Sequence, residues 1–316
     1  MMRLEKALHS ILQNCLKLER TESLQILCDP EFQRLAQHFY QVAIQITPSV
    51  FVTQVPKEVF IGYSPEVLIH FLTGADVELI LTSSDIHNIA PYQRALAKGV
   101  RIAYLPKIAE ETLIRVMAAR HQKISNRSEK LAEIFSIGKK ALVTNVDGTH
   151  LTFSLFREQG IVETGLLHKR GTFSVLPGGR AQVRPNPGTC EGEVVINGAL
   201  EGVGLLQAPV ILKIKKGFIT KIYGGKEAQI FRHYLNSFKK NMRCIVRLGV
   251  GTNHRAKLCG NLPTDERVLG TFHLGIGDLA TATSTTLTPF YCRGVLLKPN
   301  LVIDGRQILQ NGKFSI

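Results

Sequence analysis

The chain has 316 residues, which is long enough for two domains with a core each. Apolar residues make up 44% and aromatic residues 7%, a balance that excludes an intrinsically disordered chain. The formal net charge of +14 favours an acidic ligand or partner, but the basic residues are spread without a basic tail, a zinc-finger spacing or an RNA-binding signature. Nucleic acid is therefore not the favoured partner.

Strand-like and helix-like segments alternate through the first half of the chain. Apolar residues at helical spacing, or a proline at a first turn, predict helices at residues 3–18, 31–46, 65–72 and 110–119. Runs of branched residues predict strands at residues 50–53, 77–82 and 99–103. Such alternation is typical of an open, largely parallel sheet covered by helices. Residues 1–140 are therefore predicted to form a layered α/β domain.

Glycines become frequent from about residue 141, and helical periodicity mostly disappears. Short apolar runs predict strands at residues 142–146, 151–155, 194–196, 210–214, 218–222 and 301–303. Helices are predicted at residues 125–137, joining the two halves, and at 227–238. The predicted fold class is thus α/β, with a layered domain at 1–140 and a β-rich, barrel-like domain at 141–316.

Cysteine usage and the N-terminus indicate where the protein resides. The six cysteines form no CxxC pair, and scattered cysteines in a chain of this size are typical of buried apolar positions in a reducing compartment. Residues 1–15 mix charged and apolar side chains, unlike a signal peptide, and no apolar run is long enough to span a membrane. We expect a cytoplasmic protein without a membrane segment.

Three segments of the second half carry candidate chemistry: Leu176-Pro-Gly-Gly-Arg180, Arg247-Leu-Gly-Val-Gly-Thr-Asn253 and Asp265-Glu-Arg-Val-Leu-Gly-Thr-Phe-His273. Glu266 and His273 could share a metal ion, because carboxylate and imidazole are ordinary ligands of zinc, cobalt and iron. The structural alternative is that His273 hydrogen-bonds backbone and Glu266 pairs with an arginine. Asn253 suits a tight turn, since asparagine tolerates left-handed backbone, and a ligand contact is its alternative role.

The order of these segments resembles the aminopeptidase T family of dinuclear metallopeptidases, also called thermophilic leucyl aminopeptidases. The resemblance runs from about Gly99 to the C-terminus and rests on Gly251-Thr-Asn253, Asp265-Glu266 and Gly270-Thr-Phe-His273, among others. It implies a thermophilic-metalloprotease-like fold, aminopeptidase activity and a homodimer. The family also resembles a ring-cleaving iron dioxygenase, which needs a His, His and Asp set that this chain lacks at the late pair of positions.

The resemblance implies six metal-ligand positions, of which this chain keeps Glu266 and His273. The other four positions carry carboxylates or a histidine in the family, and here they are Arg180, Arg247, Tyr291 and Arg293. A guanidinium is always protonated and cannot donate a lone pair to a metal. Exchange of three carboxylates for three guanidiniums raises the formal charge by about six units. The site is therefore predicted to repel divalent cations.

From this comparison we expect an aminopeptidase-like protein without a resident cofactor, either a pseudoenzyme or an enzyme with changed chemistry. The side chains expected to bind a peptide or another small anionic ligand are Arg180, Arg247, Arg293, Tyr291 and Asn253. In the competing interpretation, the arginines form internal salt bridges with Glu266 and Asp265. The alternative functions are a metal-dependent aminopeptidase that holds zinc, cobalt or manganese through Glu266 and His273, and a nucleic-acid-binding protein.

Overall fold

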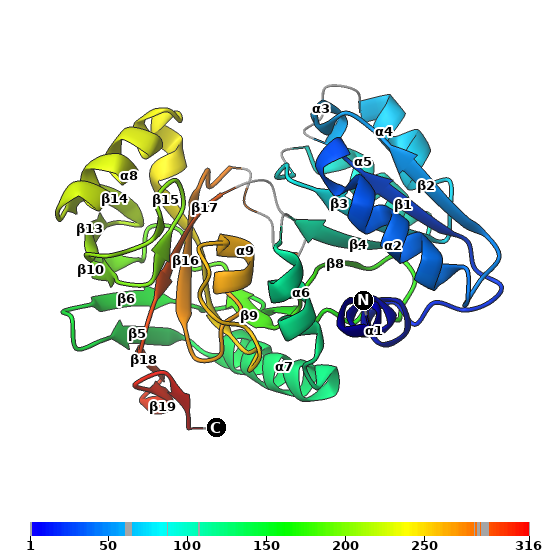
Figure 1. Ribbon diagram of the computed structural model, residues 1–316. Coiled ribbons are helices and arrows are strands. Elements are labelled where there is room, and N and C mark those ends of the chain that lie inside the picture. Colours follow the sequence, from blue (N-terminus) through cyan, green and yellow to red (C-terminus); the bar gives the residue numbers. More distant parts are fainter. Residues whose placement is uncertain are drawn as a thin grey trace. The chain divides into compact units, whose positions relative to one another are not determined.

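The computed structural model describes residues 2–60, 65–86, 88–106, 108–280, 282, 285 and 291–315. This part of the chain forms two compact units (Figure 1). The described residues of the first unit come from Met1–Ser125 and Glu163–Gly178, and those of the second from Asn126–Val162, Gly179–Thr285 and Tyr291–Ile316. The predicted domain limit at residue 140 stays a prediction.

The first unit is built on a parallel sheet of five strands in the order β2-β1-β3-β4-β8. Its strands are β1 Leu24–Cys28, β2 Val50–Gln54, β3 Val77–Thr82, β4 Arg101–Pro106 and β8 Phe173–Val175. Strands β1, β3 and β4 are buried along their whole length. Burial on both faces explains why they read as nearly continuous apolar runs.

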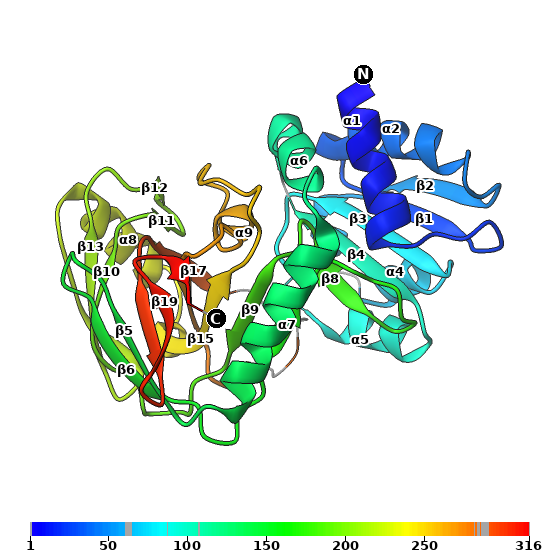
Figure 2. The same ribbon diagram turned by 90° about the horizontal axis from the view of Figure 1, so that it is seen from below.

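Helices cover both faces of this sheet (Figure 2). On one face lie α1 Met2–His9, α2 Gln33–Ala43 and α6 Glu110–Met117, and on the other lie α4 Pro65–Leu72 and α5 Ala90–Ala97. A short helix, α3 Lys57–Phe60, precedes α4. The predicted helix over residues 3–18 is an α-helix only to His9, because residues Ser10–Cys15 form a π-helix.

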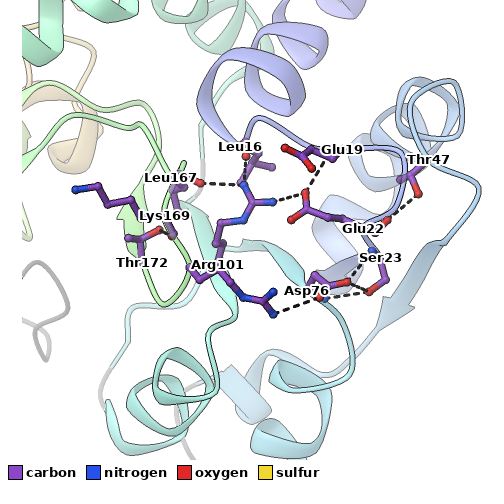
Figure 3. A network of polar contacts seen from close by, with 11 residues as sticks. Leu16, Glu19, Glu22, Ser23, Thr47, Asp76, Arg101, Leu167, Lys169 and Thr172 are labelled. Atoms are coloured by element: carbon purple, nitrogen blue, oxygen red, sulfur yellow. Dashed lines mark hydrogen bonds and ion pairs between the residues drawn. The ribbon is translucent and has the colours of Figure 1, made fainter.

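A buried arginine fixes the segment that carries β8 within the first unit (Figure 3). The Arg101 guanidinium donates to the backbone oxygens of Leu16 and Leu167, the latter at 3.0 Å, and pairs with Glu22 Oε2 at 2.5 Å. Because Leu167 lies far along the chain from the other partners, this contact ties a late segment to the N-terminal helix and to β4.

The second unit contains an antiparallel sheet of fifteen strands within the described residues, with helix α8 Lys226–Asn236 beside β13 and β14 (Figure 1). Its strands include β5 Lys140–Thr144, β6 His150–Ser154, β10 Glu191–Ile196, β11 Ala199–Leu200, β12 Gly204–Leu205, β13 Val210–Lys215, β14 Phe218–Tyr223, β18 Asn300–Ile303, β19 Arg306–Gln310 and β20 Lys313–Phe314. The others are β7 Ile161–Glu163, β9 Arg180–Val183, β15 Cys244–Gly251, β16 Phe272–Gly277 and β17 Cys292–Leu296. Helix α7 His121–Ile137 leads into this unit.

The predicted fold class is confirmed, since a helix-covered parallel sheet is combined with a large antiparallel sheet. The sequence did not predict β9, β15, β16 and β17, which hold the candidate site. No helix within the described residues is long and apolar enough to cross a membrane.

Candidate functional site

Four neighbouring strands of the second unit bring most of the predicted site residues to one face. In the register of β9, β15, β16 and β17, Arg180 lies opposite Gly251, and Arg247 lies opposite Gly275, which in turn lies opposite Arg293. Paired residues of antiparallel strands point to the same face, and so do residues two apart along a strand. His273, opposite Gly249, therefore shares this face with the three arginines.

Glycines on this face leave the room that the large side chains need. A Cβ at Gly249 would lie 2.6 Å from His273 Nε2, and one at Gly275 would lie 2.7 Å from the Tyr291 ring. At Gly251, a Cβ would collide with the backbone of residues 266–268. The glycines of the second and third motifs thus serve close packing within strands, which is a recognised use of glycine in sheets.

Glu266 lies at the centre of the charged cluster. It follows the short helix α9 Leu262–Asp265, whose N-cap Asn261 accepts from the backbone N–H of Thr264. Its Oε2 accepts from Arg180 Nη1 at 2.5 Å and lies 3.6 Å from Arg293 Nε and 3.9 Å from Arg267 Nη1. The Glu266 side chain is 1% exposed. A buried carboxylate is tolerated when it is paired in this way.

Tyr291 and Glu201 complete the cluster around the arginines. The Tyr291 hydroxyl lies 3.1 Å from Arg180 Nη1, which donates to it, and the Arg293 guanidinium lies 5.1 Å from the centre of the Tyr291 ring. Arg293 Nη1 also donates to Glu201 Oε2 at 2.9 Å. A guanidinium over an aromatic ring is attracted by the negative face of the ring. Arg293 is thus held by a carboxylate on one side and a ring on another.

The remaining predicted site residues occupy separate places. Arg247 is 1% exposed, and its Nη2 donates to the Thr285 carbonyl at 3.2 Å. Asn253 is buried, forms an isolated β-bridge with Val268 and precedes a turn, where its Oδ1 accepts from the Arg255 N–H at 2.9 Å. The structure therefore brings Arg180, Arg293 and Tyr291 together around Glu266, and Arg247 and His273 lie on the same face of the sheet.

One interpretation expected Asp265 to pair with an arginine, but its carboxylate binds backbone N–H groups instead. Its carboxylate accepts from the backbone N–H groups of Cys259 at 2.8 Å and Gly260 at 3.0 Å. Burial raises the pKa of Asp265 to about 6, against the lowering effect of those hydrogen bonds. Asp265 thus fixes the loop before α9, and Glu266 alone of the acidic pair faces the arginines.

Sequence reasoning missed two members of the cluster, Arg267 and Glu201. Arg267 is 1% exposed and directly follows Glu266, so its position in the Asp-Glu-Arg run was the available signal. Glu201 had no local signal, because it reaches Arg293 only through the pairing of β11 with β17. A two-residue strand such as β11 is too short to be read from a pattern.

The sequence model of the family NicX, 2,5-dihydroxypyridine 5,6-dioxygenase, matches residues 5–315 of the chain. The 2,5-dihydroxypyridine 5,6-dioxygenase of Pseudomonas putida is 26% identical over 190 residues, which cover 57% of this chain and 52% of the relative. The matched part thus spans about half the length of that curated relative.

Two solved structures share the fold. A 2,5-dihydroxypyridine dioxygenase from Pseudomonas putida superimposes with a TM-score of 0.80 at 18% identity, covering 98% of this chain and 96% of the other. AmpT from Thermus thermophilus superimposes with a TM-score of 0.71 at 14% identity, covering 100% and 99%. At these identities the two structures establish the fold alone.

The assignment to the aminopeptidase T family is wrong. The family match over residues 5–315 and the curated relative both point to the dioxygenase, and the likeness to AmpT is one of fold. The expected function, an aminopeptidase-like pseudoenzyme that binds a peptide or small anion, is therefore wrong as well. The same findings overturn the two alternatives, a metal-dependent aminopeptidase and a nucleic-acid-binding protein. The physical reason is that the Gly-Thr-x-His frame packs the strands of a fold that hosts more than one chemistry.

Because the curated relative is a dioxygenase, iron is the metal whose usual ligands we compare with the side chains on this face. Non-haem iron oxygenases hold iron with two histidines and one carboxylate. Among the described residues, no three His, Cys, Asp or Glu side chains gather in a way that could hold a metal ion. At an effective dielectric constant of about 20, a divalent cation about 5 Å from one guanidinium is repelled by roughly 7 kcal/mol. The donor set around Glu266 therefore does not fit such a centre.

Proposed function

We propose, because this chain belongs to the NicX family of 2,5-dihydroxypyridine 5,6-dioxygenase, that it is an oxygenase of hydroxylated pyridines or closely related hydroxylated aromatic rings. The observation that carries the proposal is the family match, which extends from residue 5 to residue 315. The curated relative and the first of the two solved structures bear the same activity in their names.

The cluster on the β9–β15–β16–β17 face offers groups that suit such a ring. Arg180 and Arg293 can donate to an ionised ring hydroxyl, and a charge-assisted hydrogen bond of this kind is stronger than a neutral one. The Tyr291 ring supplies an aromatic surface beside the Arg293 guanidinium. Glu266 Oε1 is buried and accepts no hydrogen bond from the described residues, so it can accept one from a ring O–H or N–H. We assign the substrate contacts to these four side chains.

Oxygen uptake and loss of ring absorbance measure the proposed reaction directly. The purified chain is mixed with 2,5-dihydroxypyridine and related hydroxylated pyridines in air, with and without added Fe(II). We expect consumption of at least one ring with uptake of oxygen, and a loss of about tenfold or more in kcat/KM for Arg293→Gln. The matched control is Arg306→Gln, because Arg306 is exposed on β19. No consumption of any ring under either condition would count against the oxygenase proposal.

We also propose a homodimer located in the cytoplasm. The homodimer was implied by a resemblance that gave the right fold, and the cytoplasm rests on the scattered cysteines. Light scattering on the purified chain tests the homodimer. A monomer across the accessible concentration range would contradict it. The net charge of +14 remains the support for nucleic acid, which we do not propose as a partner.

A further inference from the structure

One oxygen atom of Glu266 has three guanidiniums within 4.0 Å. Arg180 Nη1 lies 2.5 Å from Glu266 Oε2, Arg293 Nε lies 3.6 Å away and Arg267 Nη1 lies 3.9 Å away. The side chains of Arg180, Arg267 and Arg293 are 5%, 1% and 13% exposed. At this distance, Glu266 Oε2 directs one of its lone pairs to an N–H of Arg180.

We infer that the Arg180 guanidinium occupies the position beside Glu266 that a divalent cation would need. The chain then carries out its reaction without a divalent metal held by Glu266 and His273. This inference goes beyond the proposed function and rests on it only for the activity measurement below. It concerns how positive charge is supplied at this face, which the family match does not specify.

The surroundings of Arg180 explain how a side chain can supply the positive charge beside Glu266 in place of a metal ion. Arginine stays protonated at every pH that a folded protein experiences, so its charge does not depend on metal supply. The Tyr291 hydroxyl accepts from the same Nη1 that binds Glu266, which holds the guanidinium in one orientation. The planar fork of N–H groups can bind an ionised ring hydroxyl, as a metal ion would.

Metal retention tests the inference without any substrate. The full chain is incubated anaerobically with Fe(II), Mn(II), Co(II) or Zn(II), separated from free ions by gel filtration, and analysed by mass spectrometry for bound metal. We expect wild type to retain far less than one ion per chain, and no more than Glu266→Gln retains. Retention of one ion per chain that both Glu266→Gln and His273→Ala abolish would overturn the inference.

Substitution of Arg180 tests the role given to this side chain. Arg180→Glu places a second carboxylate beside Glu266, so we expect its affinity for Zn(II) to exceed that of wild type by about tenfold or more. Arg180→Lys keeps the positive charge and should bind no more metal than wild type. A folded Arg180→Glu variant without added affinity overturns the role of Arg180. If that variant does not fold, the comparison of wild type with Glu266→Gln still decides the inference.

Turnover in the presence of a chelator separates this inference from the proposed function. With 2,5-dihydroxypyridine as the probe, we expect EDTA or added Fe(II) to change kcat/KM by less than about twofold. A loss of about tenfold with EDTA, restored by Fe(II), overturns the inference while it supports the oxygenase. If no ring is consumed, the proposed function fails, and the metal measurement judges the inference by itself.

Discussion

Glu266 is the carboxylate around which three described arginines gather. Arg180, Arg293 and Arg267 all lie within 4.0 Å of one of its oxygens, and its side chain is 1% exposed. Removal of one partner from a buried ion pair leaves the other charge desolvated and without compensation. The stability of this part of the sheet therefore depends on one carboxylate.

Glu266→Gln should lower the free energy of unfolding by about 3–5 kcal/mol, the usual cost of breaking a buried ion pair. Urea unfolding followed by far-ultraviolet circular dichroism measures the change. Glu201→Gln is the matched control, because the Glu201 side chain is 19% exposed and lies 2.9 Å from one of these arginines, Arg293. That substitution should cost less, about 1–2 kcal/mol. Equal losses at the two positions would contradict the central place given to Glu266.

At the scale of elements, the glycine content of the strands that form the site explains why they were not predicted from the sequence. Strands β15 and β16 contain the sequences Arg247-Leu-Gly-Val-Gly251 and Phe272-His-Leu-Gly-Ile-Gly277. Glycine is depleted in strands and enriched in turns, so these runs did not read as strands. Every residue of both strands is buried, and the glycines stand where side chains or backbone atoms of neighbouring segments approach closely. These close contacts are tertiary, so the local sequence pattern does not indicate them.

Apolar runs, by contrast, predicted three strands of the first unit. The predicted strand over residues 77–82 coincides with β3, and the predicted strands at 50–53 and 99–103 overlap β2 and β4. Central strands of a helix-covered parallel sheet are apolar on both faces, which gives a strong local signal. Strand β1 was not predicted, although it is buried along its whole length. Strand β8 was not predicted because it has three residues and joins the sheet from a distant segment. Its place depends on tertiary pairing that a local pattern does not contain.

Gly275→Ala should disturb the site through strand β16. A Cβ at this position would lie 2.7 Å from the Tyr291 ring and 2.8 Å from Arg247 Cβ, so the ring must move. Overpacking of this kind costs about 1–3 kcal/mol and should also lower ring turnover. Gly277→Ala is the matched control on the same strand, since its closest contact would be 3.1 Å. Thermal unfolding and kcat/KM measure the pair, and a milder effect at Gly275 than at Gly277 would contradict the packing argument.

Strand β3 contains a buried carboxyl that should make the first unit sensitive to pH. Glu78 is fully buried, and its two oxygens make no hydrogen bond within the described residues. Burial raises the pKa of Glu78 from 4.5 to about 9. The folded state then binds more protons than the unfolded state between these values. Stability is therefore greatest below the unfolded pKa and is lost as the pH rises towards the folded pKa.

Glu78→Gln should remove this dependence. Relative to the variant, wild type should lose up to about 1.4 kcal/mol of stability for each pH unit between about pH 5 and pH 8. Urea unfolding read by hydrogen exchange of peptides that cover β3 measures the slope. The exposed Glu58 gives the control, Glu58→Gln, which should leave the slope of wild type unchanged. Parallel pH profiles for wild type and Glu78→Gln would show that Glu78 does not titrate as its burial indicates.

At the scale of the whole molecule, the motifs identified the fold but not the chemistry. The solved dioxygenase and AmpT both superimpose over nearly the full chain, with TM-scores of 0.80 and 0.71. Motifs that pack strands, such as the glycine frame around His273, follow the fold. Arg180 and Arg293 were named from the sequence as candidate site residues, and the structure places both beside Glu266. Contacts of Glu201 and Arg267 required the tertiary fold.

The two units are interleaved along the chain, because the first takes residues 163–178 from beyond the start of the second. This segment supplies β8, whose Phe173 is 8% exposed and packs in the core with Tyr92 and Tyr104. It also supplies the Leu167 carbonyl that accepts from Arg101 at 3.0 Å. Without the segment, β4 becomes an open edge with a buried-type apolar sequence, and exposed edges of this kind promote association.

A fragment of residues 1–140 should therefore fold poorly, although it contains four of the five strands of its sheet. Loss of Phe173 alone should cost about 3–5 kcal/mol, a large part of the stability of a small domain. The comparison is a fragment of residues 1–125 joined by a flexible Gly-Ser linker to residues 163–178, which restores β8 and the Leu167 carbonyl. We expect the joined fragment to be monomeric, with a cooperative thermal transition by circular dichroism, and the 1–140 fragment to aggregate or bind a hydrophobic dye. Cooperative unfolding of the 1–140 fragment at the same temperature would show that β8 is dispensable to the first unit.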